Sequence, residues 1–254
     1  MPRTCVFCGG TPVTAEHLWP DWLRRRESLR ESRLHVQVTQ HLAQESERRE
    51  WTDHPFKMRA KAVCATCNTG WMSDLEQATI VLLDGMIDGR GRALHQTGQR
   101  TLAAWALKGA MMFDQGAPAE ARTIPSAHYS ELLETGEPPV GARVWIGAYD
   151  ETQLGVSNVI AAEVTALGQT DPDHRNVYVR TFTIGPVAFQ VFGTTNPALF
   201  GLAYDWPESN VHLIWPFEKS ITWMPRPAMT DITLAEFGQR IVGGLARQAQ
   251  VVEP

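Results

Sequence analysis

Four cysteines are the residues of this chain whose spacing most clearly indicates chemistry. They form two C-x-x-C pairs, Cys5 with Cys8 and Cys64 with Cys67, and the sequence contains no other cysteine. Two residues between thiolates is the spacing at which one tight turn presents both sulfurs to a tetrahedral metal. Glycines 9 and 10 follow the first pair, where such a turn requires a positive φ. The pattern predicts one structural Zn²⁺ held by all four cysteines.

A redox-active dithiol is the alternative interpretation of a C-x-x-C pair. It predicts one pair on a βαβ unit and leaves the second pair without a role. Structural disulfides are disfavoured because the N-terminal sequence MPRTCVFCGG has no apolar stretch typical of a secretory signal, so we expect a cytoplasmic protein. No run of 18 apolar residues occurs, so we expect no membrane association. With 43% hydrophobic and 20% charged residues, the 254-residue chain has the composition of a globular protein.

Three polar residues flank the cysteine pairs. Glu16 and His17 follow Cys8, and Asn68 comes directly after Cys67. A zinc shared by the two pairs would bring these three side chains into one small module. Carboxylate and amide oxygens suit Mg²⁺ or Mn²⁺, and a neutral imidazole can take a proton from water near pH 7. Each residue also has a structural interpretation: His17 as a packed histidine, Glu16 as a surface acid or the group that orients His17, and Asn68 as a left-handed cap of the turn.

The paired cysteines, the acidic-His pair between them and the Asn after the last Cys resemble the zinc-stapled branch of the HNH (His-Me finger, ββα-metal) endonucleases. The branch of recombination endonuclease VII is the most similar in pattern, and the resemblance covers residues 1–76. It implies metal-dependent hydrolysis of DNA phosphodiester bonds, with a catalytic Mg²⁺ or Mn²⁺ on Glu16 and Asn68 and with His17 as general base. The zinc would be structural. Stand-alone bacterial HNH proteins, which the whole chain resembles, imply a role in defence against foreign DNA.

A basic segment before the second cysteine pair also resembles that branch. Arg59 and Lys61 lie two residues apart on one face of the expected strand, and we expect them to contact substrate phosphate. The chain departs from the family in three ways. Arg59 stands near the position of a middle Asn, and Glu16 stands where Asp is usual, which moves the carboxylate by about 1.5 Å. The long interval from His17 to Cys64 requires an insertion, at about residues 21–55.

The charge distribution supports an alternative function. Residues 1–61 carry 11 basic and 8 acidic side chains, whereas residues 62–254 carry 12 and 20. Only the N-terminal quarter would therefore attract a polyanion. The alternative is a degenerate HNH module that binds nucleic acid or protein without cutting, and a homodimer or partner protein bound through the C-terminal domain is compatible with it.

The remaining sequence predicts an α+β protein. Residues 1–76 would form the zinc-stapled ββα-metal module, residues 77–118 a helical connector, and residues 119–254 a mainly antiparallel β domain of unknown role with a terminal helix. A capping box of Ser73 and Glu76 would begin a helix over residues 73–86. Further helices are expected over 99–113 and 234–248, and a polar loop over 43–53. Alternation and β-branched content predict strands over 34–39, 144–149, 158–167, 177–184, 187–193 and 211–215.

Overall fold

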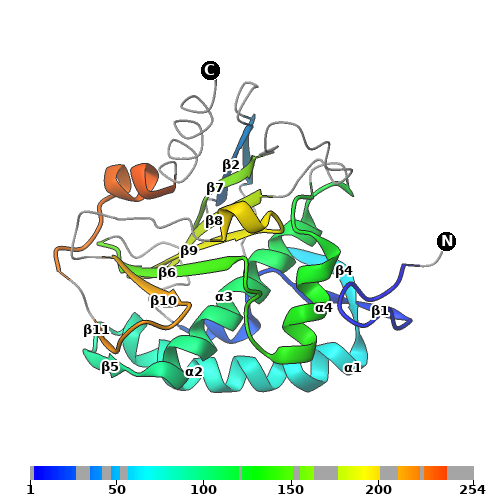
Figure 1. Cartoon of the computed structure of the whole chain (residues 1–254), viewed down its shortest axis with the longest axis horizontal. Coiled ribbons are helices and arrows are strands. Elements are labelled where there is room, and N and C mark those ends of the chain that lie inside the picture. Colours follow the sequence, from blue (N-terminus) through cyan, green and yellow to red (C-terminus); the bar gives the residue numbers. More distant parts are fainter. Residues whose placement is uncertain are drawn as a thin grey trace.

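The fold was obtained as a computed structural model, which describes residues 3–26, 35–41, 47–51, 57–119, 122–150, 155–162, 177–200, 211–223 and 226–238. Of these, residues 35–41, 47–51 and 155–162 are described by their backbone alone. The protein is α+β, as predicted. A strand pair and its helices lie beside the cysteines, a long helix runs through the centre, and a large sheet stands above it (Figure 1).

The strand pair consists of β1 (Val13–His17) and β4 (Arg59–Cys64). The two strands are antiparallel, and the first residue of each lies opposite the last residue of the other. Along β4 the first four residues alternate between exposed and buried, which leaves Arg59 and Lys61 exposed on one face, as expected. Cysteine 64 therefore marks one end of the pair, and the acidic-His residues mark the other.

Three consecutive helical segments follow β4: α1 (Ala65–Cys67), a π-helical turn (Asn68–Met72) and α2 (Ser73–Ile87). The backbone is kinked at Gly70, where φ is −93° and ψ is −117°. These helical segments carry Asn68 and Glu76 to the end of the strand pair that carries Glu16.

The predicted capping box is wrong. Helix α2 does begin at Ser73, as expected, but Ser73 has helical dihedral angles, its N–H bonds to the carbonyl of Gly70, and no side-chain capping hydrogen bond is made at this helix start. The helical stretch begins earlier, at Ala65, directly after Cys64, whose sulfur accepts a hydrogen bond from the N–H of Cys67. Glu76 does not reach back to a cap and is instead paired with a lysine of the next long helix.

The central helix is α3 (Gln96–Gly116), which includes the predicted helix over 99–113. It packs against α2, against β4 and against strands of the large sheet. Its sequence is rich in Ala, Leu, Met and Trp, and thirteen of its residues are buried. Helix α3, which lies in the expected connector of residues 77–118, therefore packs against both the β1–β4 pair and the large sheet. A shorter helix, α4 (Ser126–Thr135), packs on α3 and ends at Gly136, whose φ is +67°.

The large sheet has seven strands in the order β10-β6-β9-β8-β7-β2-β3. All described neighbours are antiparallel except β2 and β7, which are parallel. The strands are β2 (His35–His41), β3 (Glu47–Trp51), β6 (Ala142–Ala148), β7 (Gly155–Ala162), β8 (Val177–Ile184), β9 (Val187–Thr194) and β10 (Val211–Trp215). The predicted strands are confirmed within one to three residues, apart from residues 163–167, which lie outside the described residues. Gly185, with φ of +53°, forms the tight turn between β8 and β9.

The polar loop predicted over 43–53 is wrong in part, because Glu47–Trp51 forms strand β3. Its charged residues suppressed the usual strand signal. At the end of the described sheet order, however, a strand needs no two-sided apolar character, and charge there hinders edge-to-edge pairing. Two strands of the expected insertion, β2 and β3, therefore extend the large sheet rather than the β1–β4 pair.

The large sheet is covered on both faces. One face, with Tyr178, Phe182 and Phe189, packs on α3 in a core that also contains the three buried cysteines. The other, with Trp145 and Phe192, packs against the chain near Met229 and the helical residues 231–238. The buried aromatic residues of β6, β8 and β9 thus build the core, as expected. The predicted terminal helix is helical up to residue 238, and its remainder lies outside the described residues.

Two small elements complete the described chain. Strands β5 (Arg92–Leu94) and β11 (Ile221–Trp223) form an antiparallel pair beside α3, and a 3₁₀ turn covers Asp21–Arg25. None of the helices in the described part of the chain has the length and apolarity that crossing a membrane requires.

Candidate functional site

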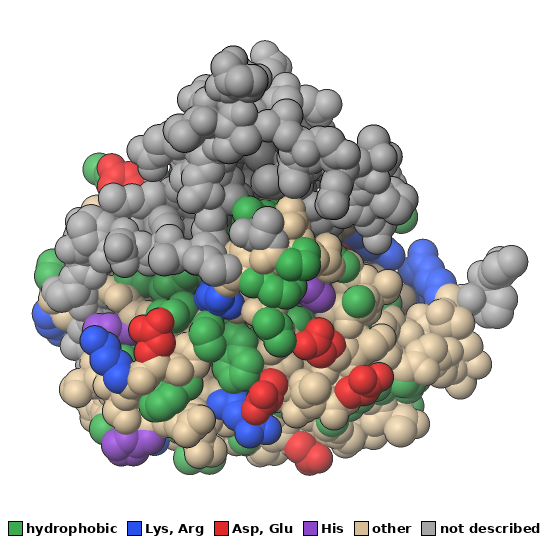
Figure 2. Space-filling model, viewed as in Figure 1, with side chains coloured by type: hydrophobic (Ala, Val, Ile, Leu, Met, Phe, Trp, Pro, Cys, Tyr) green, Lys and Arg blue, Asp and Glu red, His purple; other side chains and the backbone are tan. Residues whose placement is uncertain are grey.

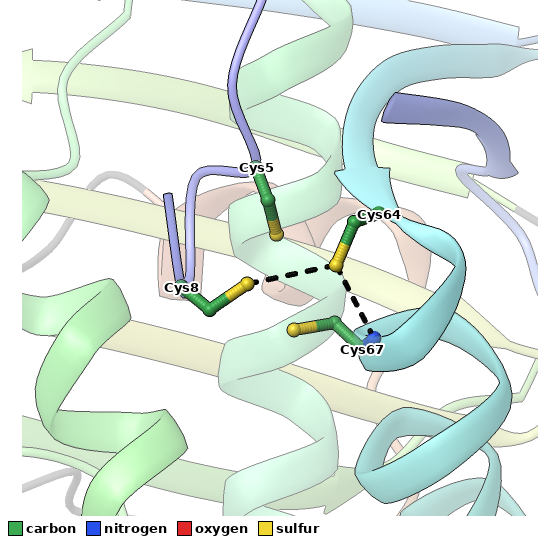
Figure 3. Close-up of side chains that lie close together, drawn as sticks. All are labelled: Cys5, Cys8, Cys64 and Cys67. Atoms are coloured by element: carbon green, nitrogen blue, oxygen red, sulfur yellow. Dashed lines mark hydrogen bonds between the residues drawn. The ribbon is translucent and has the colours of Figure 1, made fainter. Parts of the chain in front are cut away.

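The four cysteines form one cluster, although 56 residues separate Cys8 from Cys64. Their sulfur atoms all lie within 4.8 Å of one another, and the Sγ atoms of Cys8 and Cys64 are 3.5 Å apart. Figure 3 shows Cys5 and Cys8 on the N-terminal loop, and Cys64 and Cys67 where β4 passes into α1, with the sulfurs directed toward one another. Cys8 is exposed and the other three are buried.

Local backbone geometry brings each pair into place. Gly9 adopts the positive φ of +72° that the sequence predicts, and the N–H of Gly10 lies 3.4 Å from the sulfur of Cys8. A Cβ atom on Gly10 would lie 3.2 Å from the sulfur of Cys8, so only glycine leaves room for the cluster without movement. In the second pair, the N–H of Cys67 lies 3.5 Å from the sulfur of Cys64. Both turns therefore direct a backbone N–H group at a sulfur of the cluster.

The cluster suits a structural zinc ion. Tetrahedral zinc with bonds of about 2.3 Å places its sulfur ligands about 3.8 Å apart, and the observed cluster has this size. Four thiolates leave no open coordination position, which is the arrangement of a structural rather than a catalytic site. The ring of Phe7, between the first two cysteines, packs edge-on against Trp71 at 4.9 Å and also contacts Tyr129. The cluster therefore ties the N-terminal loop to the helices.

A second polar site lies in a pocket of about 260 Å³. The structure brings the three candidate residues Glu16, His17 and Asn68 together in the wall of this pocket. The other lining residues are Pro20, Asp21, Thr69, Met72, Ser73 and Glu76. None of the four cysteines lines it, so the cysteine cluster and the pocket are separate sites.

Secondary structure explains how residues distant in sequence share this pocket. Glu16 and His17 end strand β1, and Asp21 begins the 3₁₀ turn that follows. Asn68 lies in the π-helical turn and Glu76 in α2, and both line the pocket. Asn68 has right-handed helical dihedral angles, φ −64° and ψ −49°, so its alternative role as a left-handed cap is wrong.

Glu16 is a buried carboxylate. Its side chain is 11% exposed. Burial raises its pKa above the ordinary range, and the charge of Lys108 and a hydrogen bond from Asn68 oppose that rise. The interpretation of Glu16 as a surface acid is therefore wrong. Buried carboxylates are normally paired or bound to metal, and the oxygens of Glu16 face both a cation and an amide.

Lys108 reaches the site from the central helix α3. Its side chain is 3% exposed, and its Nζ lies 2.5 Å from Oε1 of Glu76 and 3.8 Å from Oε1 of Glu16. One buried ammonium thus lies between two carboxylates. Without this positive charge, Glu16 and Glu76 would repel each other in a poorly solvated place.

His17 is bonded to its neighbour across the strand pair. Nε of Arg59 donates a hydrogen bond to Nε2 of His17 at 3.0 Å. Partial burial and the positive charge of Arg59 lower the pKa of His17, which favours the neutral form of the imidazole. Lys61 lies two residues along β4 on the same exposed face as Arg59.

Two residues of the pocket region were not identified from the sequence as site residues. Capping rules explain Glu76 as part of a helix start, whereas its pairing with Lys108 depends on tertiary packing. Lys108 lies in an apolar helical segment where a single charge is unusual, and that anomaly was the available signal. Only the tertiary packing of α3 shows that Lys108 points at the carboxylates.

Comparisons with known proteins gave no match. No family model matches the chain, and neither a curated protein nor a solved structure matches it significantly. The resemblance to HNH endonucleases therefore depends on the sequence motifs of residues 1–76, of which the structure shows the four-cysteine cluster.

Proposed function

We propose that the protein is a metal-dependent endonuclease that hydrolyses phosphodiester bonds of DNA. The observation that carries this proposal is the pocket in which Glu16, His17 and Asn68 meet beside a four-cysteine cluster. Carboxylate and amide oxygens are the donors that Mg²⁺ and Mn²⁺ prefer, and Glu76 adds a further carboxylate to the pocket wall.

In this proposal Glu16 and Asn68 hold the divalent ion. A bound Mg²⁺ or Mn²⁺ would supply Lewis-acid stabilisation of the negative charge that develops on phosphate oxygens. His17 takes a proton from the attacking water, because a neutral imidazole is the suitable base near pH 7. Arg59 and Lys61 hold the substrate phosphate from the exposed face of β4. The zinc on the four cysteines keeps the two chain segments together and takes no part in the reaction.

Plasmid nicking tests this proposal. Purified zinc-loaded protein is incubated with supercoiled plasmid and Mn²⁺ or Mg²⁺, or with neither ion, and the same is done with His17→Ala. The matched control is His95→Ala, because His95 is exposed, bonds to Ser220 and does not line the pocket. We expect metal-dependent nicking that is lost in His17→Ala and kept in His95→Ala.

Two outcomes contradict the proposal. Nicking that persists in His17→Ala shows that the cutting does not come from this site. Absence of nicking in the wild-type protein, with one zinc per chain measured in the same sample, shows that the folded module does not cut this DNA under the conditions tested.

A non-catalytic, zinc-dependent nucleic-acid- or protein-binding module is the second candidate. The acidic residues 62–254 favour it, because a nuclease usually presents more positive charge to DNA. On the face shown in Figure 2, positively and negatively charged side chains of the described residues are interspersed. A binding module keeps its gel shift with nucleic acid, or its capture of a partner protein, in His17→Ala.

A further inference from the structure

The hydrogen bond between Arg59 and His17 determines where the imidazole carries its proton. A guanidinium Nε always bears hydrogen and has no acceptor capacity. Its partner at 3.0 Å, Nε2 of His17, must therefore be the unprotonated nitrogen. In a neutral ring the single proton is then on Nδ1.

The same bond occupies the atom that a general base would use. A neutral imidazole has one nitrogen lone pair, and in this tautomer that lone pair is on Nε2. Arg59 holds it. A water molecule in the pocket can therefore transfer a proton to His17 only after the guanidinium has moved away.

We propose that Arg59 is a positioning residue that sets the tautomer of His17 and releases Nε2 when a phosphate group binds its guanidinium. This inference rests on the proposed nuclease function. In the resulting step the water proton passes to Nε2 and the water oxygen forms a bond to phosphorus. The bond from phosphorus to the 3′ oxygen breaks, its electron pair stays on that oxygen, and the oxygen takes a proton from solvent water. The phosphate that is attacked is thus the group that makes the base available.

Two features of the strand pair support this role. Arg59 and His17 are direct partners in the antiparallel register, so the backbone itself brings their side chains together. Arg59 is exposed, so a ligand can reach its guanidinium. A phosphate offers the guanidinium charge-assisted, two-pronged hydrogen bonds, which are stronger than one bond to a neutral ring nitrogen.

Nitrogen NMR of the imidazole rings tests the tautomer directly. Full-length, zinc-loaded protein with ¹⁵N-labelled histidine is recorded without Mg²⁺ or Mn²⁺, and the His17 signals are assigned by their loss in His17→Gln. We expect an unprotonated Nε2 and a protonated Nδ1. In Arg59→Met we expect the signals to shift toward the Nε2–H tautomer. Lys61→Met, which removes a cation from the same strand face, is the control and leaves the wild-type pattern.

Titration with inorganic phosphate tests the release. In the wild-type protein we expect the Nε2 signal to lose the shift caused by the guanidinium bond while Nε2 stays unprotonated. In Arg59→Met we expect phosphate to leave the spectrum unchanged. A protonated Nε2 in the free protein, an unchanged tautomer in Arg59→Met, or no response of wild-type Nε2 up to the highest soluble phosphate concentration would each overturn the inference.

None of these readouts requires DNA cleavage. A protein that shows the expected shifts but does not nick plasmid refutes the proposed function and leaves the role of Arg59 in setting the tautomer intact. A protein that nicks plasmid while its Nε2 stays bound to Arg59 in saturating phosphate refutes the release and leaves the nuclease intact.

Discussion

The two ends of the β1–β4 strand pair are built in different ways. At the end marked by Cys64, four sulfurs are held by short turns, each with N–H groups from neighbouring residues. At the other end, Glu16 and His17 meet Asn68 and Glu76 from the helical stretch that follows β4, and Lys108 of α3 lies near the two carboxylates. The first end is organised locally and the second by tertiary packing.

We infer from this difference that the cysteine end stabilises the fold and that the pocket end carries the reactive groups. The cysteine end has identical soft ligands and no open position, which suits a permanent ion. The pocket end has mixed oxygen donors, an imidazole with a lowered pKa and a buried cation that balances part of the negative charge. We therefore expect changes at the cysteine end to affect folding first, and changes at the pocket end to affect charge balance and reactivity while the fold persists.

The largest expected effect comes from Cys64→Ser. Structural zinc contributes about 10–16 kcal/mol of apparent binding free energy in small modules, comparable to the net stability of a whole domain. We expect Cys64→Ser to lose zinc and the N-terminal module to unfold, since Cys64 is buried and supplies one of the four sulfurs of the cluster. Zinc content by mass spectrometry and tryptophan fluorescence during thermal unfolding measure both effects.

The matched control for this substitution is Thr66→Ser, which lies exposed between Cys64 and Cys67. It should retain one zinc per chain and the wild-type unfolding temperature. A Cys64→Ser protein with wild-type unfolding would mean that hydrophobic packing around Phe7, rather than zinc, holds this end together.

An intermediate effect is expected from Lys108→Met. Removing one partner of a buried ion pair leaves an uncompensated charge, at a cost of about 3–5 kcal/mol. We expect about 3 kcal/mol here, since Glu76 keeps 21% of its side chain exposed. Urea unfolding at pH 7.5 measures the loss, and zinc content should not change.

A double-mutant cycle sharpens this result. Adding Glu76→Gln to Lys108→Met removes both charges of the closest pair, and we expect it to restore most of the lost stability. If the two substitutions add independently, the contact of Lys108 Nζ with Glu76 is not a source of stability, and the pocket is not balanced by that lysine.

The contrast between the two ends of the strand pair also explains which features could be predicted from the sequence. The cysteine cluster follows from two spacings and from Gly9, because both turns are local. The strands of the large sheet follow from local alternation and turns such as that at Gly185. Strand β3 could not be recognised this way, because its charged residues are acceptable only at an edge, and an edge is a property of the assembled sheet.

The pocket shows the same limit. Glu16, His17 and Asn68 were identified by their positions beside the cysteines, and the structure brings them to one pocket. Lys108 lies forty residues after Asn68, and the partners of Glu76 depend on how α3 packs against α2. Local capping rules gave Glu76 a plausible but wrong role, because those rules do not include a buried cation from another helix.

The smallest expected effect is a gain in stability from Glu16→Gln, with a definite pH dependence. Burial raises the pKa of Glu16, so the native state binds its proton more tightly than the unfolded state does. For a raised carboxyl pKa, that stabilisation is complete below the ordinary pKa and is lost as pH rises through the native one. Glutamine mimics the protonated form, so Glu16→Gln should unfold at a higher temperature than wild type at pH 7.5 and at the same temperature near pH 4.

Calorimetry at these two pH values, in buffer without Mg²⁺ or Mn²⁺, measures this difference, with Glu134→Gln at an exposed position of α4 as the control. Equal stability at both pH values, or a loss at pH 7.5, would mean that Lys108 and Asn68 fully compensate the buried charge. A gain at pH 7.5 would mean that the chain keeps an ionised carboxylate in this pocket at a cost to its own stability. Such a cost is typical of residues kept for binding or catalysis, and the cysteine end should show no counterpart to it.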